Sequence, residues 1–301
     1  MPYSKVVRDD LLGRYSASLP DTSRAMLTSH ARAFLSWLGD GEPDGAAVRS
    51  WMAKMKKEHY ADATLRQDWG ILRRLYVING LAWPFRRGDA PVVREQEVYA
   101  PALDPADVKM MVDVALGREK RKGGPKPDSA HRAYLCLSTI WGLRRIEMAE
   151  MREEHLDIPN NLLFVQTAKH GRQRYHHVPE EIWPYLLEWS FVTPMTVTKL
   201  SGLFGDLKEM IGLTGSPAEE VGWHCIRRSA VAVAFSIGLS EPEVHSFYRW
   251  KRSSNNMALR YATSRMVGTA ISSPRGLWGE DKMVDEKVYS LHPFFRFWTG
   301  G

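Results

Sequence analysis

The sequence predicts a mainly α-helical protein of two domains with one small β-hairpin. Apolar residues recur at helical spacing along most of the 301 residues, and a basic stretch without periodicity, residues 86–101, separates them into two parts. Only residues 162–178 show the pattern of a short hairpin. With 44% hydrophobic and 25% charged residues, the chain can bury a sizeable core, which excludes a disordered or collagen-like polymer.

The first domain, residues 1–85, is predicted to be a small helical bundle. Apolar residues recur at helical spacing over residues 27–38, after an N-cap at Asp21, and again over residues 48–55 and 65–76. Three arginines of the last helix lie off its apolar stripe and suit contact with a DNA backbone. They are Arg66, Arg73 and Arg74. A solvated helix face that binds nothing would show the same pattern.

Residues 86–101 are predicted to be an extended basic linker. They contain two prolines and no sustained periodicity, which is typical of a connector between domains. We expect Arg86 and Arg87 of this linker to contact DNA phosphates, as we do Lys122 in a second basic stretch, the loop of residues 118–128.

The second domain, residues 102–270, is predicted to be mostly helical. Asp104 and Pro105 are typical of a helix start, and a helical pattern from residue 130 to 151 is broken at Gly142. The hairpin of residues 162–178 turns at His170-Gly171. Further helical stretches are expected over residues 179–189, 196–211, 225–237, 241–248 and 254–265. A tail, residues 271–301, ends in large aromatic side chains that must be buried somewhere.

Several function classes are excluded by absent patterns. Two cysteines, Cys136 and Cys225, cannot form a disulfide framework, and no cluster has metal-ligand spacing, so we expect a reducing, intracellular location and no metal. The longest nearly apolar run, residues 229–239, is too short to cross a bilayer, and residues 1–5 lack a signal-peptide core. No glycine-rich phosphate loop, HExxH or GxSxG sequence occurs, and no cofactor is expected. A net charge of +6 suits a phosphate-rich partner without demanding one.

Chemically active side chains of the second domain lie in short motifs with a fixed order. Their sequences are Thr139–Glu147 with an arginine after Gly-Leu, the hairpin turn Thr167–Arg174, His224-Cys225-Ile226-Arg227, and Ala258-Leu259-Arg260-Tyr261. Gly238 follows His224 by fourteen residues, and Trp250 follows Gly238 by twelve. In this order and spacing the sequence resembles the tyrosine recombinases, the phage integrase family, in the Cre-like variant with tryptophan at the third box.

The resemblance implies a tyrosine recombinase architecture, with a helical core-binding domain and a mostly α catalytic domain that carries a small sheet. It covers nearly the whole chain, weakly in the first third. The catalytic residues that it implies are Arg144, Glu147, Lys169, His224, Arg227, Trp250 and Tyr261. Tyr261 would be the nucleophile, Lys169 would protonate the leaving 5′-hydroxyl, and Glu147 would orient His224 or Arg144. Trp250 would donate its indole N–H to the phosphate, and Arg172 in the hairpin turn would contact DNA.

These residue types suit cleavage of a phosphodiester without metal. Two planar, permanently charged guanidiniums stabilise the extra negative charge on a pentacoordinate phosphorus, as Arg144 and Arg227 would. A phenol can form a covalent phosphotyrosine, which stores the bond energy until a second hydroxyl reverses the step. Tyr248 is a rival nucleophile, but it precedes Trp250, on the wrong side of that residue.

The resemblance further implies double-stranded DNA as the partner and no membrane. It implies that four copies of the chain assemble on two DNA sites and that the reaction passes through a 3′-phosphotyrosine and a Holliday junction. It also implies that the tail docks on a neighbouring protomer, whereas packing on its own domain is the simpler alternative. Three other functions stay open: a type IB topoisomerase, which shares the cleavage step; a non-catalytic DNA-binding module of recombinase descent; and a helical interaction scaffold.

Overall fold

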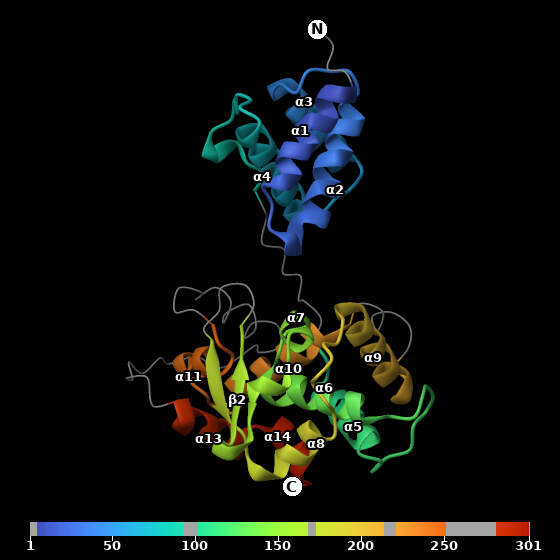
Figure 1. Cartoon of the computed structure of the whole chain (residues 1–301), viewed down its shortest axis with the longest axis vertical. Helices are drawn as coiled ribbons and strands as arrows, with labels where there is room; N and C mark the ends of the chain where they lie inside the picture. The colour runs from blue at the N-terminus through green and yellow to red at the C-terminus, as the bar shows by residue number, and fades with distance from the viewer. Residues whose placement is uncertain (1–4, 93–101, 168–172, 214–220, 251–280, 301) are drawn as a thin grey trace. The chain divides into compact units, whose positions relative to one another are not determined.

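Two units make up the chain in the computed structural model, Met1–Val98 and Tyr99–Gly301, and each is described here by itself (Figure 1). The structure describes residues 5–92, 102–167, 173–213, 221–250 and 281–300. The division between the units falls within the predicted linker, residues 86–101. Among the described residues, no helix combines the length and the apolar character needed to cross a membrane.

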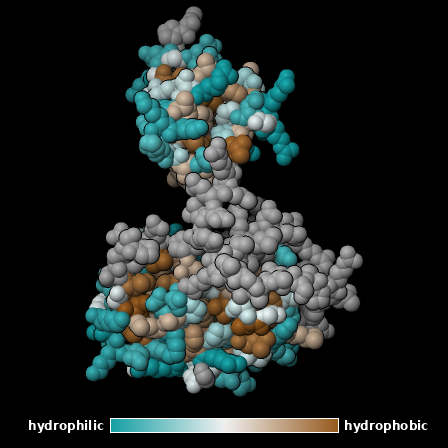
Figure 2. Space-filling view, turned by 180° about the vertical axis from the view of Figure 1, so that it is seen from behind, coloured by the Kyte–Doolittle hydropathy of each residue, from teal (hydrophilic) through white to brown (hydrophobic). Residues whose placement is uncertain are grey.

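The first unit is a bundle of helices. Its helices are α1 (Lys5–Ala17), α2 (Asp21–Leu38), α3 (Gly45–Lys57) and α4 (Asp62–Ile78), followed by a 3₁₀ turn at Arg87–Asp89. Helix α1 was not predicted, because only Leu11 and Tyr15 of its thirteen residues are buried. Hydrophilic side chains cover much of the visible face of this unit (Figure 2), as expected where the apolar stripes of the helices face inward.

The start of the predicted linker is not an extended connector. Ala90 is buried in the core of the first unit, and Phe85 packs on the Trp69 ring at a centroid distance of 4.6 Å. Arg86 and Arg87 therefore lie on the bundle. Trp83 and Phe85, which directly precede the predicted linker, pack on each other and Trp83 packs on Trp69. This aromatic packing holds the start of the linker on the bundle in spite of its polar composition.

The second unit contains the helices and strands that position the candidate site. Its elements are α5 (Pro105–Ala115), α6 (Ser129–Trp141), α7 (Arg145–Ala149), β1 (Leu156–Asp157), β2 (Leu162–Val165), β3 (Arg174–His177), α8 (Trp183–Leu187), α9 (Val197–Met210), α10 (Trp223–Ser236), α11 (Glu241–Phe247), α13 (Asp281–Leu291) and α14 (Pro293–Thr299), with 3₁₀ turns at Glu153–His155, Ile158–Asn160 and Glu180–Ile182. The Asp104 side chain accepts from the Ala106 N–H at 2.9 Å, as the predicted helix start requires.

Helix α6 lies near the centre of this unit (Figure 1), packed by α5, α8, α10 and α14. Every residue from Ala133 to Trp141 is buried. The helix ends at Gly142, whose left-handed backbone (φ +57°) suits glycine because an L side chain is strained there. The turn that follows leads directly into α7.

The sheet has three antiparallel strands in the order β1-β2-β3. The hairpin β2–β3 was predicted, whereas β1 was not, because a two-residue strand leaves no alternation to detect. Leu163 pairs with His176 and Val165 with Arg174, and all four residues are buried. The sheet therefore turns two basic side chains of β3 inward.

The described part of the tail packs on its own domain, whereas docking on a neighbouring protomer stays a prediction. Helix α14 packs against α5 and α6, Phe294 and Trp298 are fully buried, and the Trp298 indole N–H donates to Thr139 Oγ1 at 2.9 Å. This partner lies within the same unit, so the aromatic side chains need no second chain to leave water.

Replacing Gly142 by alanine is expected to destabilise the second unit. A Cβ at this position would lie 2.8 Å from Tyr248 Cε1 and 3.4 Å from Arg227 Cγ, on a backbone with positive φ. We expect a loss of about 1–3 kcal/mol in the free energy of unfolding, measured by chemical denaturation. Gly202→Ala is the control, because this exposed helical glycine has open space around it and alanine there should be neutral or stabilising by up to about 1 kcal/mol. Equal stability of the two variants would contradict the account of the Gly142 turn.

Candidate active site

The turn after α6 delivers the first predicted catalytic pair. Arg144 is the residue before α7, and its backbone N–H donates to Glu147 Oε2 at 2.8 Å while its Nη1 donates to Oε1 at 2.6 Å. The Glu147 side chain is fully buried, whereas that of Arg144 is 17% exposed. Glu147 therefore fixes the Arg144 guanidinium at the surface of the domain.

The second predicted arginine meets the same turn from α10. Arg227 is fully buried, its Nη1 donates to the Gly142 carbonyl, and its Nη2 donates to the Tyr248 carbonyl at 2.7 Å. Its guanidinium carbon lies 5.6 Å from the centre of the Trp250 ring, within cation–π range. Arg144 and Arg227 are thus brought together by residues 142–144, and Trp250 covers the second of them.

His224 lies one turn before Arg227 on α10 and is exposed. Residues three apart on a helix share a face, so the exposed imidazole and the buried guanidinium belong to the same side of α10. This placement fits the predicted His-x-x-Arg motif.

Three predicted site residues, Lys169, Arg172 and Tyr261, lie outside the described residues. The rival nucleophile Tyr248 is described, and it is fully buried. Burial raises the pKa of its phenol, and the positive charges of Arg227 and Arg249 offset only part of this rise. Among the described residues its hydroxyl has no hydrogen-bond partner. A phenol that is enclosed and hard to ionise is a poor nucleophile.

The electrostatics of the site centre on Glu147. Burial opposes ionisation of this carboxyl, but the guanidiniums of Arg249, Arg227 and Arg144 outweigh it and lower the pKa of Glu147 to about 2. The carboxylate is therefore charged at neutral pH, and it compensates the positive charge that surrounds it.

Arg249 is a member of this cluster that the sequence analysis missed. It is fully buried, and its Nη2 lies 3.4 Å from Glu147 Oε2. The buried pair Arg174 and Asp285 and the buried His176 were missed as well. Arg249 is signalled in the sequence only by its adjacency to Trp250. Arg174 is the last residue of the hairpin-turn motif, whereas His176 and Asp285 lie in no motif.

The predicted DNA-contacting arginines of the first unit separate into two groups. Four of them line a cavity of about 330 Å³ together with Trp69, Trp83 and Phe85. These four are Arg66, Arg73, Arg86 and Arg87. Arg74 does not line this cavity, and its Nη2 donates to the Ser18 carbonyl at 2.9 Å. The cavity, with cations around aromatic rings, has the composition of a nucleic-acid surface.

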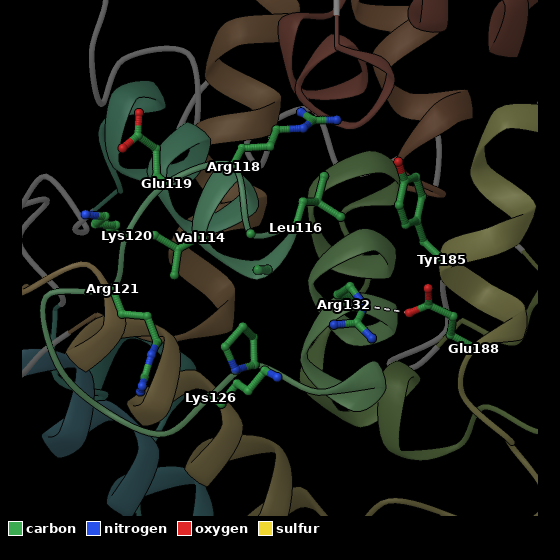
Figure 3. A pocket seen from close by; sticks show the side chains of 13 residues that line it. Val114, Leu116, Arg118, Glu119, Lys120, Arg121, Lys126, Arg132, Tyr185 and Glu188 are labelled. Atoms are coloured by element: carbon green, nitrogen blue, oxygen red, sulfur yellow. Dashed lines mark hydrogen bonds and ion pairs between the residues drawn. The ribbon is translucent and has the colours of Figure 1, made fainter.

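A larger cavity, of about 810 Å³, lies between the C-terminal end of α5, the loop after it, α6 and α8 (Figure 3). Its arginines are already engaged: Arg118 donates to the Phe297 and Trp298 carbonyls, Arg121 to the Gly124 carbonyl, and Arg132 to Glu188. Arg132 lies nine residues before Trp141 on α6, so about 13 Å of helix separates this cavity from the turn at Gly142. The predicted DNA contact Lys122 lies in the adjoining loop, exposed, with its backbone N–H bound to the Met210 carbonyl.

No family model matches the sequence, and no curated protein matches it either. Solved structures do. A lambda integrase (75-356) dimer bound to a COC′ core site is 15% identical with a TM-score of 0.64, covering 88% of this chain and 99% of that one. The Tn1549 transposon integrase in complex with circular intermediate DNA is 16% identical with a TM-score of 0.61, covering 83% of this chain and 94% of that one.

The chain has the tyrosine recombinase fold. A helical first unit and a mostly helical second unit with a small antiparallel sheet are what the sequence predicted, and this part of the prediction is confirmed. Within the described ranges, no group of three or more His, Cys, Asp or Glu side chains is arranged to hold a metal ion.

The charge on Glu147 predicts a specific pH dependence of stability. Because the pKa of Glu147 is lowered from 4.5 to about 2 in the folded chain, its ionised form contributes stability that is complete above pH 4.5 and is lost as the pH falls towards 2. This contribution is about 3 kcal/mol. The free energies of unfolding of the wild type and Glu147→Gln should therefore converge as the pH falls from about 5 to about 2, whereas Glu153→Gln, an exposed control, should follow the wild type. A difference between wild type and Glu147→Gln that is independent of pH would contradict the assignment.

Proposed function

We propose that the chain is a site-specific DNA recombinase or integrase that cuts and rejoins DNA strands through a covalent 3′-phosphotyrosine. The observation that carries the proposal is the meeting of Arg144 and Arg227 at one glycine turn, within a fold shared with integrases that were crystallised on DNA. Two guanidiniums from different helices that converge on one turn are suited to the two non-bridging oxygens of a phosphate.

The remaining roles are those that the resemblance to the tyrosine recombinases implies, and the chemistry of the side chains suits them. Tyr261 attacks the scissile phosphorus, and the bond to the 5′-oxygen breaks as the phosphotyrosine bond forms. Lys169 supplies the proton that the leaving 5′-hydroxyl needs, and His224 assists from α10. Attack by the 5′-hydroxyl of a partner strand then releases the tyrosine and rejoins DNA. No external energy source is needed, because one phosphoester is exchanged for another.

Strand exchange requires more than one protomer, and we propose four copies on two DNA sites with a Holliday junction between the two rounds of exchange. The structurally similar lambda integrase was crystallised as a dimer on a core site, which fits an assembly built from DNA-bound pairs. Type IB topoisomerase activity remains the second candidate, since it needs the same cleavage step and no partner strand.

A nicked suicide duplex tests the cleavage step, because loss of the short 5′-hydroxyl strand traps the protein on DNA. The wild type should form a covalent adduct, and Tyr261→Phe should form none. Arg227→Lys should slow adduct formation at least about 100-fold, because a single ammonium cannot replace a bidentate guanidinium. Arg132→Lys, at the other end of α6, is the control that keeps the wild-type rate. Binding without an adduct would leave only a DNA-binding module, and an adduct without strand transfer between duplexes would favour the topoisomerase.

Two neighbouring arginines of α4 test the DNA surface of the first unit. Arg73 lines the arginine–aromatic cavity, whereas the Arg74 guanidinium is bound to the Ser18 carbonyl. Arg73→Ala should lower the affinity for duplex DNA and reduce the slope of log K against log salt by about 1. Arg74→Ala should have a clearly smaller effect on both. Equal effects of the two variants, measured by fluorescence anisotropy over a salt series, would contradict the assignment of this cavity to DNA.

A further inference from the structure

A buried chain of charged and polar side chains joins the tail helix α13 to the Arg144–Glu147 pair. His176 Nδ1 lies 3.3 Å from Asp285 Oδ1, and His176 Nε2 lies 2.9 Å from Arg249 Nη1. Arg249 Nη2 in turn lies 3.4 Å from Glu147 Oε2, whose other oxygen accepts from Arg144 Nη1. Helix α13, strand β3, the turn after α11 and the start of α7 thus contribute to a single connected network.

The protonation state of His176 follows from its partners. A guanidinium only donates hydrogen bonds, so His176 Nε2 must accept the one from Arg249. The ring proton is then on Nδ1, where it faces the Asp285 carboxyl. The imidazole is therefore neutral, with its Nδ1–H towards Asp285 and its Nε2 accepting from Arg249, so it orients the Arg249 guanidinium from one side.

The backbone of Arg249 is evidence that its side chain matters. This residue has φ +61°, a conformation that costs an L residue free energy, and it is fully buried. The position is the turn that ends α11, where the Arg249 N–H donates to the Ser246 carbonyl at 3.2 Å and the Trp250 N–H to the His245 carbonyl at 2.9 Å. Glycine is the usual residue in such a turn, so an arginine there indicates a use for the side chain. Its guanidinium contacts His176, Glu147 and the Trp141 carbonyl, the last at 3.2 Å.

We propose that Arg249, oriented by His176, is a positioning residue that fixes Glu147 and, through Glu147, the Arg144 guanidinium at the scissile phosphate. The inference rests on the proposed function and extends it to a residue that does not touch DNA. Arg249 directs Nη1 at His176 and the Trp141 carbonyl and Nη2 at Glu147, so its guanidinium is used within the protein, whereas the Arg144 guanidinium is partly exposed and can meet a phosphate directly.

A substrate with a methylphosphonate at the scissile position separates positioning from stability. One non-bridging oxygen is replaced by methyl, so less negative charge develops and the placement of Arg144 matters less. Arg249→Met should slow cleavage of the phosphate substrate about 10- to 100-fold but cleavage of the methylphosphonate by no more than about threefold. A variant that is merely less stable lowers both rates by the same factor, so the ratio of the two rates does not depend on the folded fraction.

Two substitutions of His176 identify the bond that matters. His176→Phe keeps a ring that packs against Phe247 but removes the hydrogen bonds to Asp285 and Arg249, and it should show the same selective loss on the phosphate substrate. His176→Gln restores an acceptor near Nε2 and should recover most of that loss. Trp183→Phe, which loses the partly buried hydrogen bond to Asn161, is the structural control and should affect both substrates equally.

The outcomes distinguish this inference from the proposed function. If the wild type cleaves neither substrate, the proposed function fails and the positioning role fails with it. If the wild type cleaves and Tyr261→Phe does not, but Arg249→Met loses equal activity on both substrates, the positioning role alone is overturned. A selective loss in Arg249→Met and His176→Phe, with recovery in His176→Gln, supports it.

Discussion

The site depends on one buried carboxylate. Arg227 and Arg249 are completely buried, and burying a guanidinium without a counter-charge is costly. Glu147 supplies the negative charge, and its lowered pKa shows that the surrounding cations determine its ionisation. Backbone carbonyls of Gly142, Trp141 and Tyr248 also accept hydrogen bonds from these guanidiniums. Without this carboxylate the positive cluster would have no stable place inside the domain.

Helix α6 explains how side chains from distant parts of the chain reach this carboxylate. It is surrounded by α5, α8, α10 and α14, and its C-terminal end is the point where α7, α10 and the end of α11 meet (Figure 1). The glycine at that end lets the chain turn sharply, so that a carbonyl and the next arginine face the same space. The tail packs Trp298 against the same helix, where its indole N–H donates to Thr139.

Local signals carried most of the prediction from sequence. The start of α5 at Asp104-Pro105, the end of α6 at Gly142 and the hairpin β2–β3 each have a signature within a few residues, and each is present. Helix α1 has little apolar face to detect. Arg144, Glu147 and Arg227 are gathered at one turn, which their spacing in the sequence could suggest but not establish.

The buried network of Arg249, His176 and Glu147 could not be predicted from the sequence for a different reason. Arg249 contacts His176 across 73 residues of sequence and Glu147 across 102, so no window of sequence contains both partners. A positive φ at a residue other than glycine leaves no mark in composition either. Such residues are found only when the fold is known, because their role is defined by what surrounds them.

The left-handed backbone at Arg249 has an evolutionary consequence. Glycine adopts this conformation at no steric cost, so the arginine is retained only while it has partners for its guanidinium. In related sequences, glycine at position 249 should therefore accompany the loss of the imidazole at 176, whereas arginine should accompany histidine or glutamine there. Covariation of these two columns would mark the group of related sequences in which the network arose.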